Sequence, residues 1–155
     1  MKIAEICRMA EEFQVALVLA KFAKTPSAGF LFFCPEDKTV FLTHRSAHMS
    51  SPGTWDLPGG QPEDTDTSPI ETANREAYEE LGNIPKKTPV KSHSIKTDKH
   101  HYIVFLVPFS AQEKKAFTEK LSLSDESDGF EWFDYDEIPS NDQTHFDLSW
   151  ITSEI

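Results

Sequence analysis

One stretch of the chain, Leu57–Ile84, combines a glycine pair, a helix start and a tight group of acidic residues. Its sequence is LPGGQPEDTDTSPIETANREAYEELGNI. Because glycine permits positive φ angles and leaves room for close contacts, Gly59–Gly60 predicts a point where the backbone approaches a ligand or a helix. The combination suggests a site for a metal ion and a phosphate group.

The helix within this stretch has recognisable start and stop residues. Ser68 is a suitable N-cap, and Pro69 suits the first helical position. Glu71, three residues after Ser68, completes a capping-box pattern. The sequence therefore predicts a helix that begins near Pro69 and ends at Gly82.

At about 100° per residue, this helix carries an apolar stripe with an acidic stripe beside it. We expect the apolar stripe to pack and the acidic stripe to face a cleft. The apolar stripe comprises Ile70, Ala73, Ala77 and Leu81, and the acidic stripe comprises Glu76, Glu79 and Glu80.

Carboxylates at this spacing repel one another by roughly 0.2–0.5 kcal/mol per pair, and a hard divalent cation would remove that repulsion. Arg75 could pair with Glu71 behind it and Glu79 ahead of it, and so fix the direction of a ligand carboxylate. Alone, such an acidic group is more often an ordinary charged helix surface. The glycine pair upstream favours the metal site.

Together with Trp55–Gly60, these residues resemble the signature of the Nudix hydrolases. That signature reads Gly, five residues, Glu, seven residues, Arg-Glu-apolar-x-Glu-Glu-x-Gly-apolar. The matching residues are Gly60, Arg75, Glu76, Ala77, Glu79, Glu80 and Gly82.

The loop between the glycines and the helix departs from the signature. Counted six residues forward from Gly60, the position of the signature Glu is occupied by Asp66. Counted eight residues back from Arg75, the same position is occupied by Thr67. The loop is therefore one residue longer than the pattern and lacks that Glu. Asp66 could substitute for it from the loop, with a shorter reach, and Glu63 is another candidate.

The resemblance implies an α/β fold, specifically a Nudix-type α/β/α sandwich with a mixed β-sheet. In such a fold the signature helix lies on one side of the sheet and the other helices on the opposite side. We expect a single domain over residues 1–155, with residues 1–26 as an N-terminal helical extension. A second departure, Asn83 in an apolar slot, leaves Ile84 to fill that position.

The resemblance also implies a Mg²⁺- or Mn²⁺-dependent pyrophosphohydrolase that cleaves a nucleoside diphosphate linked to another group. Its substrate would be of the nucleotide or nucleotide-sugar type, attacked by water at a phosphorus. The implied metal ligands are Glu76, Glu79, Glu80 and Gly60, and the implied catalytic residues are Glu79, Glu80 and Arg75. The implied substrate-binding residues are Arg45 and Gly59. Candidate accessory acids or bases are Asp66, Glu126 and Glu131.

A second hypothesis keeps the fold but not efficient turnover: a Nudix-fold module that binds a nucleotide. The missing loop Glu is the feature that favours it.

Three of the implied residues also have simpler interpretations. Arg45 could be a surface arginine that neutralises nearby acids, and Glu126 and Glu131 could be solvated loop and strand charges.

Composition limits the partners. The chain has 155 residues and a net charge of −11, without a local basic patch, so binding to a nucleic acid polymer or an anionic membrane is not expected. Phosphate groups would be repelled too, which strengthens the case for a bound metal. The expected partner is a small-molecule phosphoanhydride substrate. The absence of a signal peptide and of a long apolar run predicts a cytoplasmic protein.

The rest of the chain alternates helical and strand patterns. Helices are expected at 2–23, 111–121 and 146–155, and strands at 28–34, 39–43, 54–57, 90–97, 102–109 and 130–133. The first helix could pack on its own domain or form a homodimer contact. Cys7 and Cys34 are expected to be buried and inert.

Overall fold

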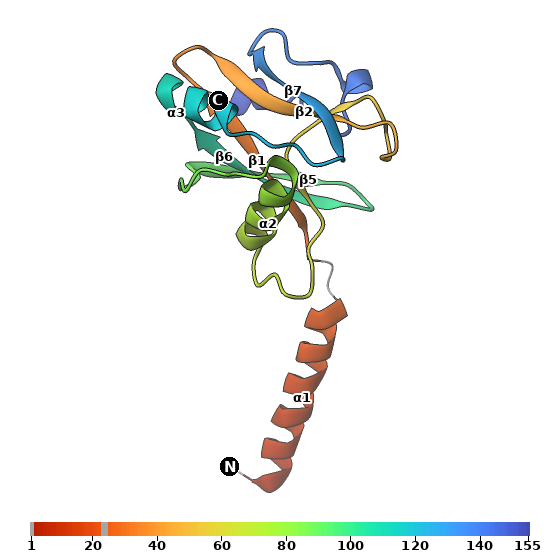
Figure 1. Cartoon of the computed structure of the whole chain (residues 1–155). Coiled ribbons are helices and arrows are strands. Elements are labelled where there is room, and N and C mark those ends of the chain that lie inside the picture. Colours follow the sequence, from red (N-terminus) through yellow and green to blue (C-terminus); the bar gives the residue numbers. More distant parts are fainter. Residues whose placement is uncertain (1, 23–24) are drawn as a thin grey trace.

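The computed structural model describes residues 2–22 and 25–155 (Figure 1). The helices are α1 (Ile3–Phe22), α2 (Pro69–Leu81), α3 (Ala111–Glu119) and α4 (Ile151–Glu154), with a 3₁₀ turn at Asn141–Gln143. The strands are β1 (Ser27–Cys34), β2 (Thr39–Arg45), β3 (Trp55–Asp56), β4 (Gly59–Gly60), β5 (Lys91–Lys96), β6 (His101–Pro108) and β7 (Ser127–Asp134).

The strands form one mixed sheet, as predicted. Its order is β3-β2-β1-β6-β5, with β4 paired to β1 and β7 paired to β2. Only the β1–β6 pair is parallel among the pairings of the described strands. The register that matters most for the site pairs Gly29 of β1 with Gly59 of β4, because it fixes the glycine pair against a buried strand.

Each face of the sheet carries its own hydrophobic cluster. On one face, the apolar stripe of α2 and Phe117 of α3 pack against β1, β2 and β6. On the other face lie residues of α4 and of the chain that follows β7, including Leu148 and Ile151. The expectation that the remaining helices lie opposite the signature helix is therefore wrong for α3, because Phe117 packs beside Phe41 and Phe32 in the α2 cluster.

The first segment is helical as predicted, and α1 extends away from the sheet (Figure 1). Ile3, Ile6 and Met9 are exposed, so the described side chains of α1 do not pack on the domain. A homodimer contact through this helix stays a prediction. Cys7 lies on α1 and is exposed, which contradicts the expectation that both cysteines are buried; Cys34 on β1 is buried.

The C-terminal segment differs from its prediction. A helix over 146–155 is wrong, because only Ile151–Glu154 is helical. The Asp147 carboxylate accepts hydrogen bonds from the backbone amide and the hydroxyl of Ser149, at 2.9 and 2.6 Å, and so stabilises a turn. In the part of the chain that the structure describes, no helix is long and apolar enough to cross a membrane.

Candidate active site

Helix α2 begins and ends where its sequence predicts. The Ser68 hydroxyl accepts from the Glu71 amide, Pro69 occupies the first turn, and Gly82 adopts a left-handed φ of 72°. The predicted capping box is incomplete, however. The Glu71 carboxylate accepts from the amide and the hydroxyl of Thr67, at 2.7 and 2.6 Å, and the structure gives it no bond to the Ser68 amide.

The glycine pair lies against α2 so closely that a side chain would not fit. A Cβ atom on Gly60 would be 2.5 Å from the Glu76 carboxyl carbon. A Cβ atom on Gly59 would be 2.5 Å from the backbone oxygen of Ala28. The predicted close approach of backbone to helix is therefore present, and it holds Glu76, the first residue of the acidic stripe, directly at the glycine loop.

Glu80 is buried, with 7% of its surface exposed, whereas the charged stripe suggested an exposed residue. Its carboxylate accepts from the Gly59 amide at 3.3 Å. Burial raises the pKa of Glu80 well above its usual value, and the nearby charges of Asp56 and Glu126 raise it further. Glu80 is thus a carboxyl group kept out of water with little positive charge near it.

Asp56 is a buried carboxylate that the sequence analysis did not single out. Its Oδ2 pairs with Arg45 Nη1 at 3.0 Å, and its Oδ1 accepts from the Leu57 amide at 2.8 Å. Burial outweighs both contacts and raises the pKa of Asp56 to about 6. The available signal was its place directly before Leu-Pro-Gly-Gly, on the strand that leads into the glycine loop.

Tyr102 is the second residue that the sequence analysis missed as part of the site. Its hydroxyl lies between Gly29 and Gly59, since a Cβ on either glycine would be 2.2 Å from it. Burial raises the pKa of Tyr102, and the charges of Asp56 and Glu80 add to this shift. Tyr102 begins an apolar strand pattern, which is consistent with packing, and only the pairing of Gly29 with Gly59 places its hydroxyl beside the acidic group.

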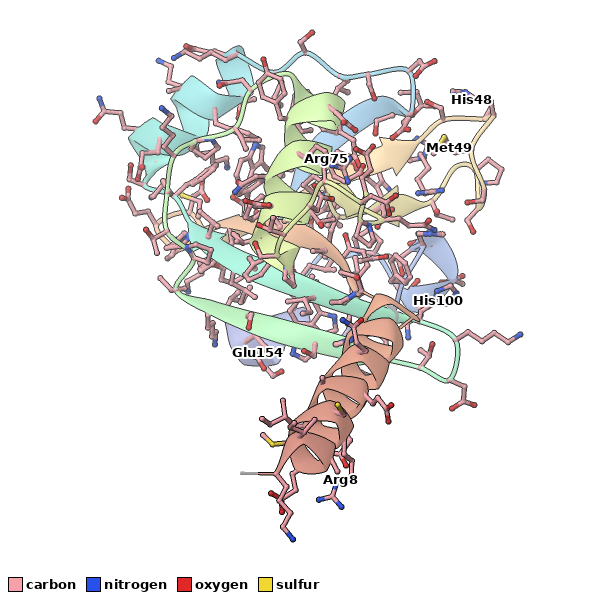
Figure 2. All side chains as sticks on the ribbon, turned by 90° about the horizontal axis from the view of Figure 1, so that it is seen from below. Arg8, His48, Met49, Arg75, His100 and Glu154 are labelled. Atoms are coloured by element: carbon pink, nitrogen blue, oxygen red, sulfur yellow. The ribbon has the colours of Figure 1, made fainter. Side chains whose placement is uncertain are left out.

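Arg75 connects α2 to the loop before it. Its guanidinium contacts Asp66 at 2.9 Å, Glu76 at 3.0 Å and Glu79 at 3.4 Å. It also donates to the Gln61 carbonyl at 2.8 Å. The structure gives no contact between Arg75 and Glu71, so the predicted pair one turn back is wrong; Asp66 takes that place. Figure 2 shows Arg75 among other side chains, whereas Arg8 on α1 lies well away from them.

Asp66 is held in the loop rather than directed at the acidic stripe. Besides Arg75, its carboxylate accepts from the Thr72 hydroxyl at 3.0 Å and from the Glu63 amide at 2.8 Å. The hydrogen bond from Arg75 is the main reason that the pKa of Asp66 lies well below its usual range. Glu63 approaches Arg75 as well, at 3.4 Å. Asp66 therefore orders the extra-long loop and holds Arg75.

The remaining predicted residues divide into those near the acidic group and those away from it. Arg45 pairs with Asp56 and also donates to the carbonyl and hydroxyl of Ser50, at 2.7 and 2.8 Å, so protein groups hold its guanidinium. Glu126 is exposed, and its charge raises the pKa of Glu76, after burial and Glu79. It therefore lies near α2.

Glu131 lies away from the acidic group. It pairs with Leu42 across β2 and β7, and Leu42 packs in the cluster on the face opposite α2. Residues paired across antiparallel strands point to the same face. The structure therefore brings together Glu76, Glu80 and Glu126 near the glycine loop, and it does not bring Glu131 to them.

The residues around the glycine loop have the chemistry that a hard divalent cation requires. Among the described residues, the carboxylate oxygens of Glu76, Glu79 and Glu80 are not all within 4.8 Å of one another, and Arg75 contacts both Glu76 and Glu79. Nevertheless, burial raises the pKa of both Glu76 and Glu80; Arg75 opposes this shift at Glu76, whereas among the described residues no cation pairs with Glu80. Carboxylate and carbonyl oxygens are the donors that Mg²⁺ and Mn²⁺ prefer. The donor set fits such an ion.

Comparison with known proteins gives the family. The NUDIX domain family matches residues 23–152. The nucleoside triphosphate pyrophosphatase/Nudix hydrolase fusion protein of Bifidobacterium longum (strain NCC 2705) is 34% identical over 101 residues, which is 65% of this chain and 20% of that protein. The chain thus spans about a fifth of the length of this curated relative.

Solved structures agree on the fold. A Nudix hydrolase from M. smegmatis, RenU, has a TM-score of 0.54 and 24% identity, over 74% of this chain and 73% of that one. A bifunctional NMN adenylyltransferase/ADP ribose pyrophosphatase from Francisella tularensis, complexed with AMP and a Mn ion, has a TM-score of 0.58 and 18% identity, over 95% of this chain and 45% of that one. With the NUDIX match over residues 23–152 and the signature residues of the glycine loop and α2, the chain belongs to the Nudix family.

Proposed function

We propose that this protein is a metal-dependent pyrophosphohydrolase that cleaves the phosphoanhydride bond of a nucleoside diphosphate linked to another group. The single observation that carries the proposal is the buried Glu80 carboxylate at the Gly59 amide, with Asp56, Glu76 and Glu126 close enough to raise its pKa. Among the described residues no cation pairs with the buried Glu80 carboxylate, and a buried charge of this kind destabilises a fold unless a ligand compensates it.

Glu76 and Glu80, with Glu79 and the Gly60 carbonyl, would hold Mg²⁺ or Mn²⁺. A divalent ion bound there neutralises phosphate charge and lowers the pKa of a bound water. The chain's own contribution is orientation. The Gly59 amide donates to one oxygen of Glu80 and so orients it, and Arg75 orients Glu76 and Glu79.

Arg75 is a positioning residue in this proposal. Its guanidinium contacts the carboxylates of Glu63, Asp66, Glu76 and Glu79 and the carbonyl of Gln61, and so connects the loop to α2. Asp66 then acts through Arg75, and we infer that it takes over the structural part of the missing loop Glu. Thr67 bonds to Glu71 instead and has no such role.

The substrate class rests on the relatives. The curated relative is described as a nucleoside triphosphate pyrophosphatase/Nudix hydrolase fusion, and the Francisella tularensis structure contains AMP and Mn. A nucleoside diphosphate derivative would combine a nucleotide with the anhydride that the site requires. Arg45 and Gly59 are the proposed contacts to its phosphates, with Asp56 and Ser50 directing the Arg45 guanidinium.

A weakened binding module is the second proposed function, and one observation favours it: Arg75 already occupies the space between Glu76 and Glu79. The two functions share partners. Both predict a small nucleotide ligand and no nucleic acid polymer, and the homodimer and the cellular location stay predictions from sequence.

The test is a turnover assay on nucleoside diphosphate derivatives, with Mg²⁺, with Mn²⁺, and with a chelator. Hydrolysis that the chelator abolishes supports the pyrophosphohydrolase. Saturable nucleotide binding without hydrolysis in either metal supports the binding module. Neither binding nor hydrolysis across the panel contradicts both.

A further inference from the structure

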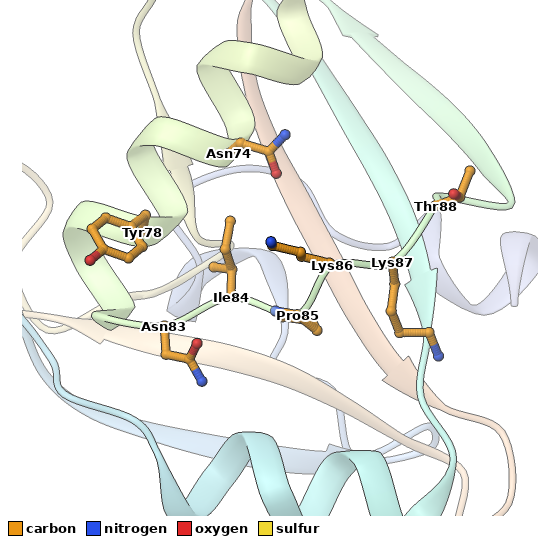
Figure 3. Close-up of a pocket in the computed structure, with 8 residues that line it drawn as sticks. All are labelled: Asn74, Tyr78, Asn83, Ile84, Pro85, Lys86, Lys87 and Thr88. Atoms are coloured by element: carbon orange, nitrogen blue, oxygen red, sulfur yellow. The ribbon is translucent and has the colours of Figure 1, made fainter.

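A hollow lies on the flank of α2 that faces away from the acidic stripe. Asn74 and Tyr78 form one wall, and the segment after α2 forms the other (Figure 3). Two residues along a helix correspond to about 200° of rotation, so Asn74 is roughly opposite Glu76. The hollow is therefore separate from the proposed metal site. Its lining residues are Asn74, Tyr78, Asn83, Ile84, Pro85, Lys86, Lys87 and Thr88.

The charge of this lining is unlike that of the chain as a whole. The eight lining residues include two lysines and no Asp or Glu, although the chain has 26 acidic and 15 basic residues. Lys87 is already used: it contacts the Pro108 carbonyl and pairs with Glu113 at 2.8 Å. Among residues 2–22 and 25–155, the Lys86 amino group has no hydrogen-bond or ion-pair partner.

Figure 3 shows the two lysines directed differently. The Lys86 amino group points into the hollow, between Ile84 and Asn74, whereas Lys87 points away from it. Lys86 therefore offers a positive charge to the hollow, and no carboxylate of the lining competes for it. An anionic group is the ligand chemistry that matches this arrangement.

The other polar groups of the hollow are equally available. Among the described residues, the side chains of Asn74, Tyr78 and Asn83 make no hydrogen bond. Tyr78 is exposed at 61%, so its ring forms an open aromatic surface at the edge of the hollow, which the partly buried Ile84 also lines. Side-chain amides can donate and accept, and an open ring can stack on a planar heterocycle. The hollow has a volume of about 650 Å³, a size typical of small-ligand sites.

We propose that this hollow binds a nucleoside monophosphate, with the phosphate at Lys86 and the base against Tyr78. The amides of Asn74 and Asn83 lie on the walls between these two ends and contact the ribose or the base edge. This site is independent of hydrolysis at the acidic group, and it would allow a nucleotide to bind on the flank of α2 opposite Glu76.

The experiment titrates AMP into the full-length protein in a buffer with a chelator and follows amide signals by two-dimensional NMR. The side-chain amides of Asn74 and Asn83 are expected to shift saturably at roughly millimolar AMP. Shifts centred on Gly59 and Gly60 instead, or no saturable shift, would overturn the proposal.

Matched variants test the two ends of the ligand. Lys86→Gln should weaken AMP binding by about fivefold or more, the effect of losing a charge-assisted hydrogen bond, and Tyr78→Ala should weaken it by a similar factor. Lys115→Gln, an exposed lysine on α3 outside the hollow, should leave the affinity within about twofold. Both lysine variants and Tyr78→Ala change exposed side chains, so a melting curve will confirm that each is folded.

Separate ligands complete the test. Inorganic phosphate alone and adenosine alone should each bind more weakly than AMP by about fivefold or more, because each reaches only one end of the hollow. Equal affinity for inorganic phosphate and AMP would overturn the role of Tyr78. Equal AMP affinity in wild-type protein and Lys86→Gln would overturn the site itself.

Discussion

The backbone amide of Gly59 donates to the buried carboxylate of Glu80 at 3.3 Å, which connects the glycine loop to the last turn of α2. Two elements separated by a long loop thereby meet at one acidic group. The contact depends on a position where a side chain is excluded, since a Cβ on Gly59 would clash with the Ala28 carbonyl and the Tyr102 hydroxyl.

Gly59→Ala should destabilise the fold by about 2 kcal/mol or more, because the new methyl group would meet backbone atoms that cannot rotate away. Chemical denaturation measures the effect. Gly129→Ala is the control, since its nearest neighbour would lie at 3.9 Å, and it should cost less than about 1 kcal/mol. An equal loss of unfolding free energy in the two variants would contradict the close packing of Gly59.

Asp66→Asn should lower the turnover rate by about 10–100-fold with little change in KM, because Arg75 loses its strongest partner and no longer orients Glu76. Thr67→Ala is the matched control and should stay close to the wild-type rate, since Thr67 contacts Glu71 alone. Steady-state kinetics on the same substrate decides. A wild-type rate in Asp66→Asn would contradict the role assigned to Asp66.

Asp66 should also contribute to acid sensitivity. Its pKa is lower in the folded chain than in the unfolded chain, so its stabilising contribution is present above about pH 4 and is lost as pH falls. The melting temperature of Asp66→Asn should therefore fall less than that of the wild type between about pH 5 and pH 3. If the melting temperatures of the two proteins fall equally with pH, the pairing of Asp66 with Arg75 does not contribute to acid sensitivity, which would contradict this prediction.

The cysteines should differ in reactivity. Cys7 is exposed on α1, and Cys34 is buried on β1, where burial raises the pKa of its thiol. A thiol reagent should label only Cys7 in the native protein and both residues after denaturation. Labelling of Cys7→Ser in the native state would show that Cys34 is accessible, against the described packing.

Local patterns predicted the fold well where one signal dominates. The bounds of α2 follow from Ser68, Pro69 and Gly82, and β1 and β6 follow from continuous apolar runs. The C-terminal segment was misassigned because Asp147 bonds to Ser149 and turns the chain, an effect that apolar spacing does not register.

The site could be predicted only in part. The spacing of Glu76, Glu79 and Glu80 gave the acidic group, but it did not reveal that Glu80 is buried. Tyr102 and Asp56 were missed because their contributions depend on long-range pairings that sequence does not encode locally: β1 with β4 for Tyr102, and β2 with β3 for Asp56. Glu131 was included through the resemblance and lies on the other face of the sheet.

The most direct test of the central claim is a melting curve of metal-free protein titrated with Mg²⁺ or Mn²⁺, for the wild type and for Glu80→Gln. An ion that binds only the native acidic group stabilises by mass action, by about 2.7 kcal/mol at a concentration 100 times its Kd. We expect the wild-type melting temperature to rise by several degrees and to return with a chelator, roughly in line with that free energy.

Glu80→Gln should be at least as stable as the wild type without metal, because a buried carboxyl with a raised pKa becomes a neutral amide. Its melting temperature should then respond little to either ion. Glu119→Gln, an exposed carboxylate at the end of α3, should keep the full response. A wild-type melting curve indifferent to both metals, or an undiminished response in Glu80→Gln, would contradict the account.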